Sequence, residues 1–119
     1  MTRTPAKNFQ DLVVRQKSHE FVRSVYQSTR AFPRKEVYGL TFQFRRAAIS
    51  IAANIAEGFK KRSRLDKVRF MNISQGSVEE CRYYLILARD LKYACEPRLM
   101  ALLEEISKLL ERYSAAIGH

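Results

Sequence analysis

The sequence has 119 residues, enough for one domain with its own hydrophobic core but too few for two. Hydrophobic residues make up 46% of the chain and charged residues 29%, and this composition argues against a disordered or a membrane-embedded chain. The four Gly and three Pro residues are too few for the many turns of an all-β fold. The net charge of +10 favours polyanionic partners, nucleic acid first and acidic membrane second.

Residues 1–8 are polar, contain Pro5 and are expected to form a flexible N-terminal arm. They lack the apolar stretch of a secretory signal, and the longest uncharged run, residues 47–56, is shorter than the ~20 residues of a bilayer helix. Cys81 and Cys95 would stand about 21 Å apart on one helix, beyond disulfide reach. We therefore expect two free thiols in a cytoplasmic protein with no membrane segment.

Two helices are predicted in the first half of the chain. Apolar residues recur at helical spacing between about residues 9 and 30, and Phe32-Pro33 ends this helix because proline disfavours the α conformation in its predecessor. Its stripe comprises Leu12, Val13, Phe21, Val22, Val25 and Tyr26. The second helix follows Pro33 and has the most regular pattern, with Gly58 as a C-cap candidate. Its stripe comprises Leu40, Phe44, Ala47, Ala48, Ile51, Ala52, Ile55 and Phe59.

Two further helices are predicted in the second half. Ser63 followed by Asp66 fits a capping box and predicts the start of the third helix. Its inner stripe is expected to comprise Phe70, Ile73, Ser77, Cys81, Tyr84, Ala88 and Leu91. Pro97 suits the first turn of the fourth helix. The fourth stripe comprises Leu99, Leu102, Leu103, Ile106, Leu109, Leu110, Tyr113 and Ile117. Four stripes joined by short connections predict an all-α fold, an antiparallel up-down four-helix bundle forming a single domain over residues 9–119.

Small residues are dense on the second and third predicted helices, which indicates that the two helix axes approach closely. Glycine inside a helix costs about 1 kcal/mol relative to alanine, so Gly76 is expected to make a backbone contact that a methyl group would block. Asn54 lies between apolar residues and is expected to bond a partner across an interface, because an unpaired buried amide costs about 1–3 kcal/mol. Asn54, Gly76 and Ser77 are therefore predicted to have structural roles.

The sequence offers little for catalysis. The two histidines, His19 and His119, lack the Glu-x-x-His spacing of di-metal bundles and are too few for an ordinary zinc site. No glycine-rich phosphate loop and no nucleophile elbow occurs. We expect no cofactor, no metal and no enzymatic activity, and keep an enzyme that uses Cys81 or Cys95 as the least favoured hypothesis.

Several segments together carry a resemblance to a known family: the run RRAAISIAANIAEG at residues 45–58, Ser63, Phe70, the segment ISQGSVEE at residues 73–80, and Leu91-Lys92-Tyr93. With these segments the sequence resembles the four-helix-bundle family encoded in intervening sequences of bacterial 23S rRNA genes. The resemblance covers about residues 9–117 and extends to distant relatives that are accessory proteins of diversity-generating retroelements. It implies a small all-α protomer that assembles into a ring-like homopentamer with a basic surface. The retroelement relatives bind nucleic acid and a reverse transcriptase, whereas the intervening-sequence members have no settled biochemical role.

The positive charge is concentrated in and around the second predicted helix. Residues 33–64 hold eight basic and two acidic residues, whereas residues 65–119 hold eight of each. The candidate phosphate-binding residues are Arg45, Arg46, Lys60, Lys61, Arg62 and Arg64. With Arg34 and Lys35 they form either one stripe or two patches. Most Phe and Tyr residues lie on predicted core stripes, so the signal for base stacking is weak, and we expect recognition of phosphate and shape more than of sequence.

These observations predict a non-enzymatic, nucleic-acid-binding homo-oligomer with RNA as the expected ligand, and the family resemblance implies a pentamer. The alternative is a protein-interaction scaffold that docks an acidic partner or a polymerase such as a reverse transcriptase, with nucleic-acid binding incidental.

Overall fold

The computed structural model describes the backbone of residues 5–118 and the side chains of residues 11–117. The described backbone is entirely helical apart from its connections. The elements in chain order are α1 (Pro5–Thr29), the 3₁₀ helix η1 (Arg34–Glu36), α2 (Leu40–Lys60), α3 (Arg64–Asp90) and α4 (Arg98–Gly118). This confirms the predicted all-α fold and its four helices.

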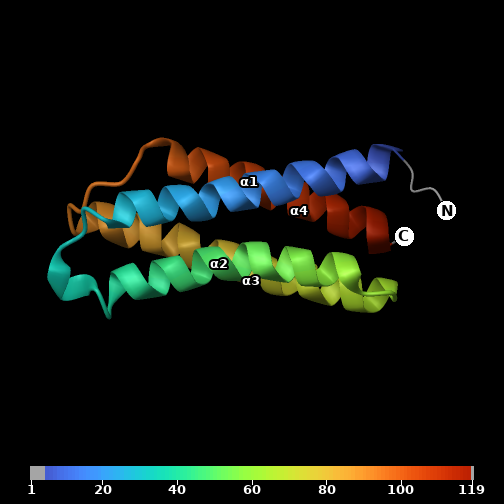
Figure 1. Ribbon diagram of the computed structural model, residues 1–119, viewed down its shortest axis with the longest axis horizontal. Coiled ribbons are helices and arrows are strands. Elements are labelled where there is room, and N and C mark those ends of the chain that lie inside the picture. The colour runs from blue at the N-terminus through green and yellow to red at the C-terminus, as the bar shows by residue number, and fades with distance from the viewer. Residues whose placement is uncertain (1–4, 119) are drawn as a thin grey trace.

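The four helices run up and down in an elongated bundle of 50 × 21 × 20 Å (Figure 1). Each helix packs against its neighbours in the chain, and α4 closes the bundle against α1, so α1 lies diagonally opposite α3. The most extensive packing is between α2 and α3. The short α2–α3 turn and the end of α4 lie at one end of the bundle, and the two longer connections lie at the other (Figure 1).

The core confirms the stripes predicted for the second and fourth helices. On α2, six of the eight predicted residues are buried, and Ala52 and Phe59 are partly buried. On α4, only Leu109 is partly buried, and the other seven are buried. These two helices have broad and regular apolar faces, so their large side chains alone define the inner surface.

On α1, the start of the helix and its inner face both differ from the prediction. The helix begins at Pro5, inside the expected arm, because proline needs no backbone donor in a first helical turn. Residues 1–4 of the arm lie outside the described residues. Leu12 and Tyr26 are exposed at 53% and 37%, while Val14 and Ser18 are buried. The Ser18 hydroxyl donates to the Val14 carbonyl oxygen at 2.7 Å, so a polar residue can occupy an inner position.

The inner face of α3 is rotated by about one residue from the predicted one. Ser77, Cys81 and Ala88 are buried as expected, but Ile73 and Leu91 are exposed, and Phe70 and Tyr84 are partly buried. The inner positions are instead taken by Met71, Ser74, Val78 and Leu85. Ser74 can lie inside because its hydroxyl donates to the Ile51 carbonyl oxygen on α2 at 2.9 Å. A stripe drawn through the large apolar side chains therefore misses the true face.

The close approach of α2 and α3 occurs at Gly58, and not at Gly76 as predicted. A Cβ at Gly58 would lie 2.3 Å from Met71 Cε and 3.0 Å from Phe70 Cβ, whereas a Cβ at Gly76 would meet nothing within 4 Å. Gly58 also lies inside α2 with no positive φ, so it is not the predicted C-cap. Its missing side chain makes room for α3.

Glu36 ties together three segments at the opposite end of the bundle. One carboxylate oxygen accepts the Leu40 N–H at 3.0 Å and so caps α2, while the other accepts the Tyr93 hydroxyl at 2.8 Å. These two bonds lower the pKa of Glu36, because both donors stabilise its charged form. The connection before α4 is thereby fastened to the start of α2.

Alanine substitution at the two glycines should have opposite effects on stability. G58A should lower the free energy of unfolding by about 1–3 kcal/mol, because the added methyl overpacks the contact with Met71 and Phe70. G76A should raise it by about 0.5–1 kcal/mol through better helix propensity. Urea unfolding followed by circular dichroism measures both. A destabilising G76A would show that Gly76 has a contact after all.

Candidate nucleic-acid interface

Four of the six predicted phosphate-binding residues lie together at the α2–α3 turn. Lys60 is the last residue of α2, Lys61 and Arg62 lie in the turn, and Arg64 is the first residue of α3. We call these four residues the turn cluster. Ser63 fixes the turn because its hydroxyl oxygen accepts the Asp66 N–H at 3.0 Å, which confirms the predicted N-cap.

Members of the turn cluster differ in how far their charge is compensated. Lys61 forms an ion pair with Glu57 at 3.6 Å and its ammonium lies 4.9 Å from the centre of the Phe70 ring. Lys60, Arg62 and Arg64 are exposed, and none of the ion pairs in the described part of the chain involves them. Three uncompensated positive charges therefore project from one end of the bundle.

Lys67, one turn into α3, is a basic residue near the turn cluster whose ammonium group makes a contact within the protein. Its ammonium donates to the Phe59 carbonyl oxygen at 3.1 Å, in the last turn of α2. Carbonyl groups at a helix C-terminus lack partners within the helix and carry partial negative charge. Lys67 therefore stabilises the end of α2.

Arg45 joins α2 to α1. Its Nε donates to Thr29 Oγ1 at 2.7 Å, an Nη donates to the Tyr26 carbonyl oxygen at 3.3 Å, and its guanidinium lies 4.5 Å from the centre of the Tyr26 ring. The Thr29 hydroxyl in turn donates to the Val25 carbonyl oxygen. The side chain is half-buried between the two helices, so its main contacts are within the protein.

Arg46, the next residue of α2, joins this helix to α3. An Nη pairs with Glu80 at 3.2 Å and its Nε donates to Gln43 at 3.2 Å. Arg46 is about 21 Å along the helix from Lys60, and residues 47–59 between them contain no Lys or Arg. Along α2 the basic residues therefore form two separate groups and not one stripe.

The predicted structural residues Asn54 and Ser77 meet at Ser50, which the sequence analysis did not single out. The Ser77 hydroxyl donates to Ser50 Oγ across the α2–α3 interface at 2.8 Å. The Asn54 amide donates to Ser50 Oγ at 3.0 Å and to the Ser50 carbonyl oxygen at 2.8 Å. The partner of Asn54 is thus in its own helix, and Ser50 carries the connection to α3.

A feature that sequence reasoning missed is a group of exposed aromatic rings beside Arg45 and Arg46. Phe42 is 52% exposed and Tyr26 is 37% exposed, although Tyr26 was predicted on the inner stripe of the first helix. A groove of about 340 Å³ lies here, and we call it the α1/α2 groove. Its lining residues are Tyr26, Val37, Thr41, Phe42, Arg45, Arg46 and Ile49.

Comparison with known proteins is consistent with this geometry and with the resemblance noted in the sequence. The profile of a family described as 23S rRNA-intervening sequence protein matches residues 10–114. The chain belongs to this family. A crystal structure from Bacteroides thetaiotaomicron VPI-5482, described as a protein with unknown function from the S23 ribosomal protein family, is similar at a TM-score of 0.77 and 29% identity. The similarity covers 89% of this chain and 98% of that one. No curated protein matches this sequence.

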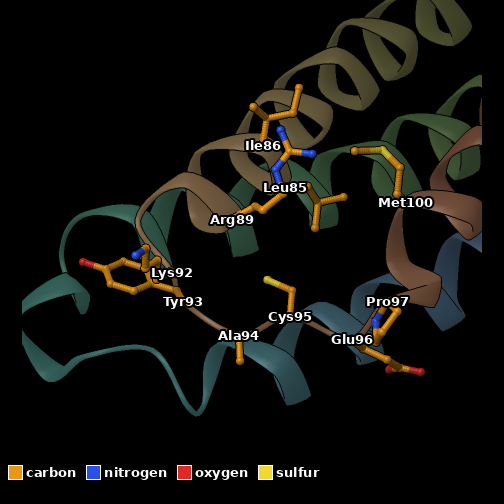
Figure 2. A pocket seen from close by; sticks show the side chains of 10 residues that line it. All are labelled: Leu85, Ile86, Arg89, Lys92, Tyr93, Ala94, Cys95, Glu96, Pro97 and Met100. Atoms are coloured by element: carbon orange, nitrogen blue, oxygen red, sulfur yellow. The ribbon is translucent and has the colours of Figure 1, made fainter.

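A second cavity of this 23S rRNA-intervening sequence protein, about 450 Å³ in volume, lies between the end of α3 and the start of α4. Figure 2 shows the Cys95 side chain pointing from the connection into this space, while Glu96 points away from it. Burial raises the pKa of Cys95, and it raises the pKa of the fully buried Cys81 well above the ordinary range. Both groups are therefore thiols near neutral pH, whereas a cysteine nucleophile needs a lowered pKa.

The described residues also offer no group of three or more His, Cys, Asp or Glu side chains that could hold a metal ion. Within the same part of the chain, each helix is too short or too polar to cross a bilayer.

The different roles of two arginines can be tested by their effects on stability. R45A should lower the free energy of unfolding by about 1–2 kcal/mol, because it removes two hydrogen bonds and the contact with Tyr26. R62A, at an exposed turn position, should change it by less than about 0.5 kcal/mol. Urea unfolding of the two variants measures the difference. Equal stability would contradict the structural role of Arg45.

Proposed function

We propose that this protein is a non-enzymatic, homo-oligomeric nucleic-acid-binding protein of the cytoplasm, with RNA as its ligand and phosphates as its main contacts. The observation that carries the proposal is the turn cluster, where Lys60, Arg62 and Arg64 are exposed without an ion pair among the described residues. Membership of the 23S rRNA-intervening sequence protein family supports a small helical bundle of this kind but assigns no ligand to it.

Part of the positive charge elsewhere on the bundle is compensated within the protein. Arg46 pairs with Glu80, Lys17 with Glu105 and Arg82 with Glu104. The excess at the turn cluster is not compensated in this way, and like charges placed close together repel one another. A polyanion relieves that repulsion and releases its own counterions, which favours binding at low salt.

The shape of the turn cluster favours contact with phosphates over contact with base edges. The cluster sits on a short turn at the end of the bundle (Figure 1). Long flexible side chains on a projecting turn bind phosphates through charge and carry little sequence information. A ring of several protomers would present several such turns to one nucleic-acid strand and so increase the overall affinity.

The outer face of α3 supports the proposed self-association. Ile73 and Tyr83 are 46% and 57% exposed there. Exposed apolar side chains on one face offer a surface that a second copy can cover. This face lies away from the turn cluster, so assembly through it leaves the basic side chains accessible.

The binding proposal predicts a steep salt dependence that three residues control. K60E/R62E/R64E should weaken binding to a ~20-nucleotide RNA by roughly tenfold or more and reduce the slope of log affinity against log salt by about three per engaged protomer. Fluorescence anisotropy at several salt concentrations measures both quantities.

A variant with the same change in net charge provides the control. R89E/K92E/K108E reverses three exposed residues, two at the opposite end of the bundle and one midway along α4, and should bind RNA nearly as well as the natural protein. Equal losses in both variants would mean that only the net charge matters. The scaffold alternative would be favoured if the natural protein had no affinity for RNA but captured one stoichiometric protein partner that stays bound after nuclease treatment.

The assembly proposal predicts the particle mass in solution. Light scattering should give about 70 kDa for a pentamer of the 13.9 kDa chain. I73E should lower this mass because it places a charge on the outer face of α3, whereas L12E, at a similarly exposed apolar residue of α1, should not. A natural protein of 13.9 kDa would contradict the assembly.

A further inference from the structure

The α1/α2 groove combines rings with positive charge in a way that the turn cluster does not. Its walls carry the partly exposed rings of Tyr26 and Phe42, and the exposed side chains of Val37 and Ile49 extend the apolar surface. A volume of about 340 Å³ falls within the roughly 300–1,000 Å³ of small-ligand sites. The groove can therefore take one flat apolar group.

The surroundings of the groove are strongly positive. Arg45 and Arg46 line it, and no acidic residue does. Arg23 and Arg30 are exposed three residues before and four residues after Tyr26, on the same side of α1. Two carboxylates beside lining residues are already engaged, since Glu80 pairs with Arg46, and Glu36, next to Val37, accepts bonds from Leu40 and Tyr93. An occupant of this groove should therefore carry negative charge beside its flat apolar part.

The charge also argues against a second copy of the chain as the occupant. The protein carries a net charge of +10, so another copy would bring like charge to a site already surrounded by arginines. An unpaired nucleotide has the required chemistry, because its base is flat and apolar on both faces and its phosphate is anionic. Unpaired bases stack on aromatic rings and on arginine guanidinium planes.

The groove already contains one such stacked pair. The Arg45 guanidinium lies over the Tyr26 ring at 4.5 Å and is held there by its bonds to Thr29 and to the Tyr26 carbonyl oxygen. Stacking surfaces that are fixed before binding lose little conformational freedom when a ligand arrives. Phe42 provides a second ring on α2, and Arg46, paired only at the surface, can contact a phosphate.

We propose that the α1/α2 groove binds an unpaired base of a single-stranded nucleic acid, stacked on Phe42 and on the Tyr26–Arg45 pair, with the adjoining phosphate at Arg46 and Arg30. This inference rests on the proposed function and adds to it a preference for single strands over duplexes. The turn cluster then contributes affinity through charge, and the groove distinguishes the strandedness of the ligand.

The test compares Phe42 variants of the full chain on single-stranded and duplex RNA of ~20 nucleotides. F42A should weaken binding to the single strand by roughly 5- to 100-fold, the loss of one base–aromatic stack, and leave duplex binding and the salt slope unchanged. F42W should retain single-strand binding. L12A, which removes an equally exposed apolar side chain from α1, should have no effect. The same strands made of DNA show whether the ribose contributes.

A spectroscopic readout reports the stack directly. A single strand containing 2-aminopurine should lose fluorescence on binding to the natural protein and to F42W, and keep it on binding to F42A. Unchanged single-strand affinity of F42A, while K60E/R62E/R64E weakens all binding, would overturn the groove site and leave the proposed function standing. Absence of any RNA binding by the natural protein would overturn both. A fall in particle mass or loss of a captured protein in F42A, without an effect on RNA, would assign the groove to a protein partner instead.

Discussion

The close contact between α2 and α3 is the constraint on which the rest of the bundle depends. Gly58 leaves room for Met71 and Phe70, so a larger residue at that position would push the helices apart. Ser74 and Ser77 then reach α2 with hydrogen bonds to the Ile51 carbonyl oxygen and to Ser50. Because small and polar residues make this contact, the interface is satisfied in hydrogen bonds as well as closely packed.

This contact also determines where the positive charge can lie. Residues 47–59 of α2 are mostly small or apolar, with Glu57 as the one charged residue, and contain no Lys or Arg. The basic residues of α2 are therefore placed before and after this stretch. At the C-terminal end Lys67 bonds the Phe59 carbonyl oxygen and Lys61 pairs with Glu57, while Lys60, Arg62 and Arg64 are left exposed. The fold uses some of its basic residues and leaves others available for a ligand.

The sequence predicts the helices well where large apolar residues alone form the inner face, as on α2 and α4. It fails on α3, because Ser74 is buried through a hydrogen bond that a hydrophobic pattern does not contain, and Ile73 is exposed. Gly76 and Gly58 show the same limit, since only the relative placement of two helices decides which glycine is in contact. Of the site, the turn cluster is predictable because its residues are adjacent in sequence. The α1/α2 groove is not, because Tyr26 and Phe42 come from different helices.

The two basic regions differ in the chemistry that they can offer to one strand. The turn cluster has exposed charge without rings, and the α1/α2 groove has rings with arginines that are partly engaged within the protein. Arg46 and Lys60 are about 21 Å apart along α2, so one strand of several nucleotides can reach both regions. A single strand that lies along α2 can therefore place a base in the groove and its later phosphates on the turn cluster. A stiff duplex can reach the turn cluster but cannot insert a paired base into the groove, so charge alone would hold it.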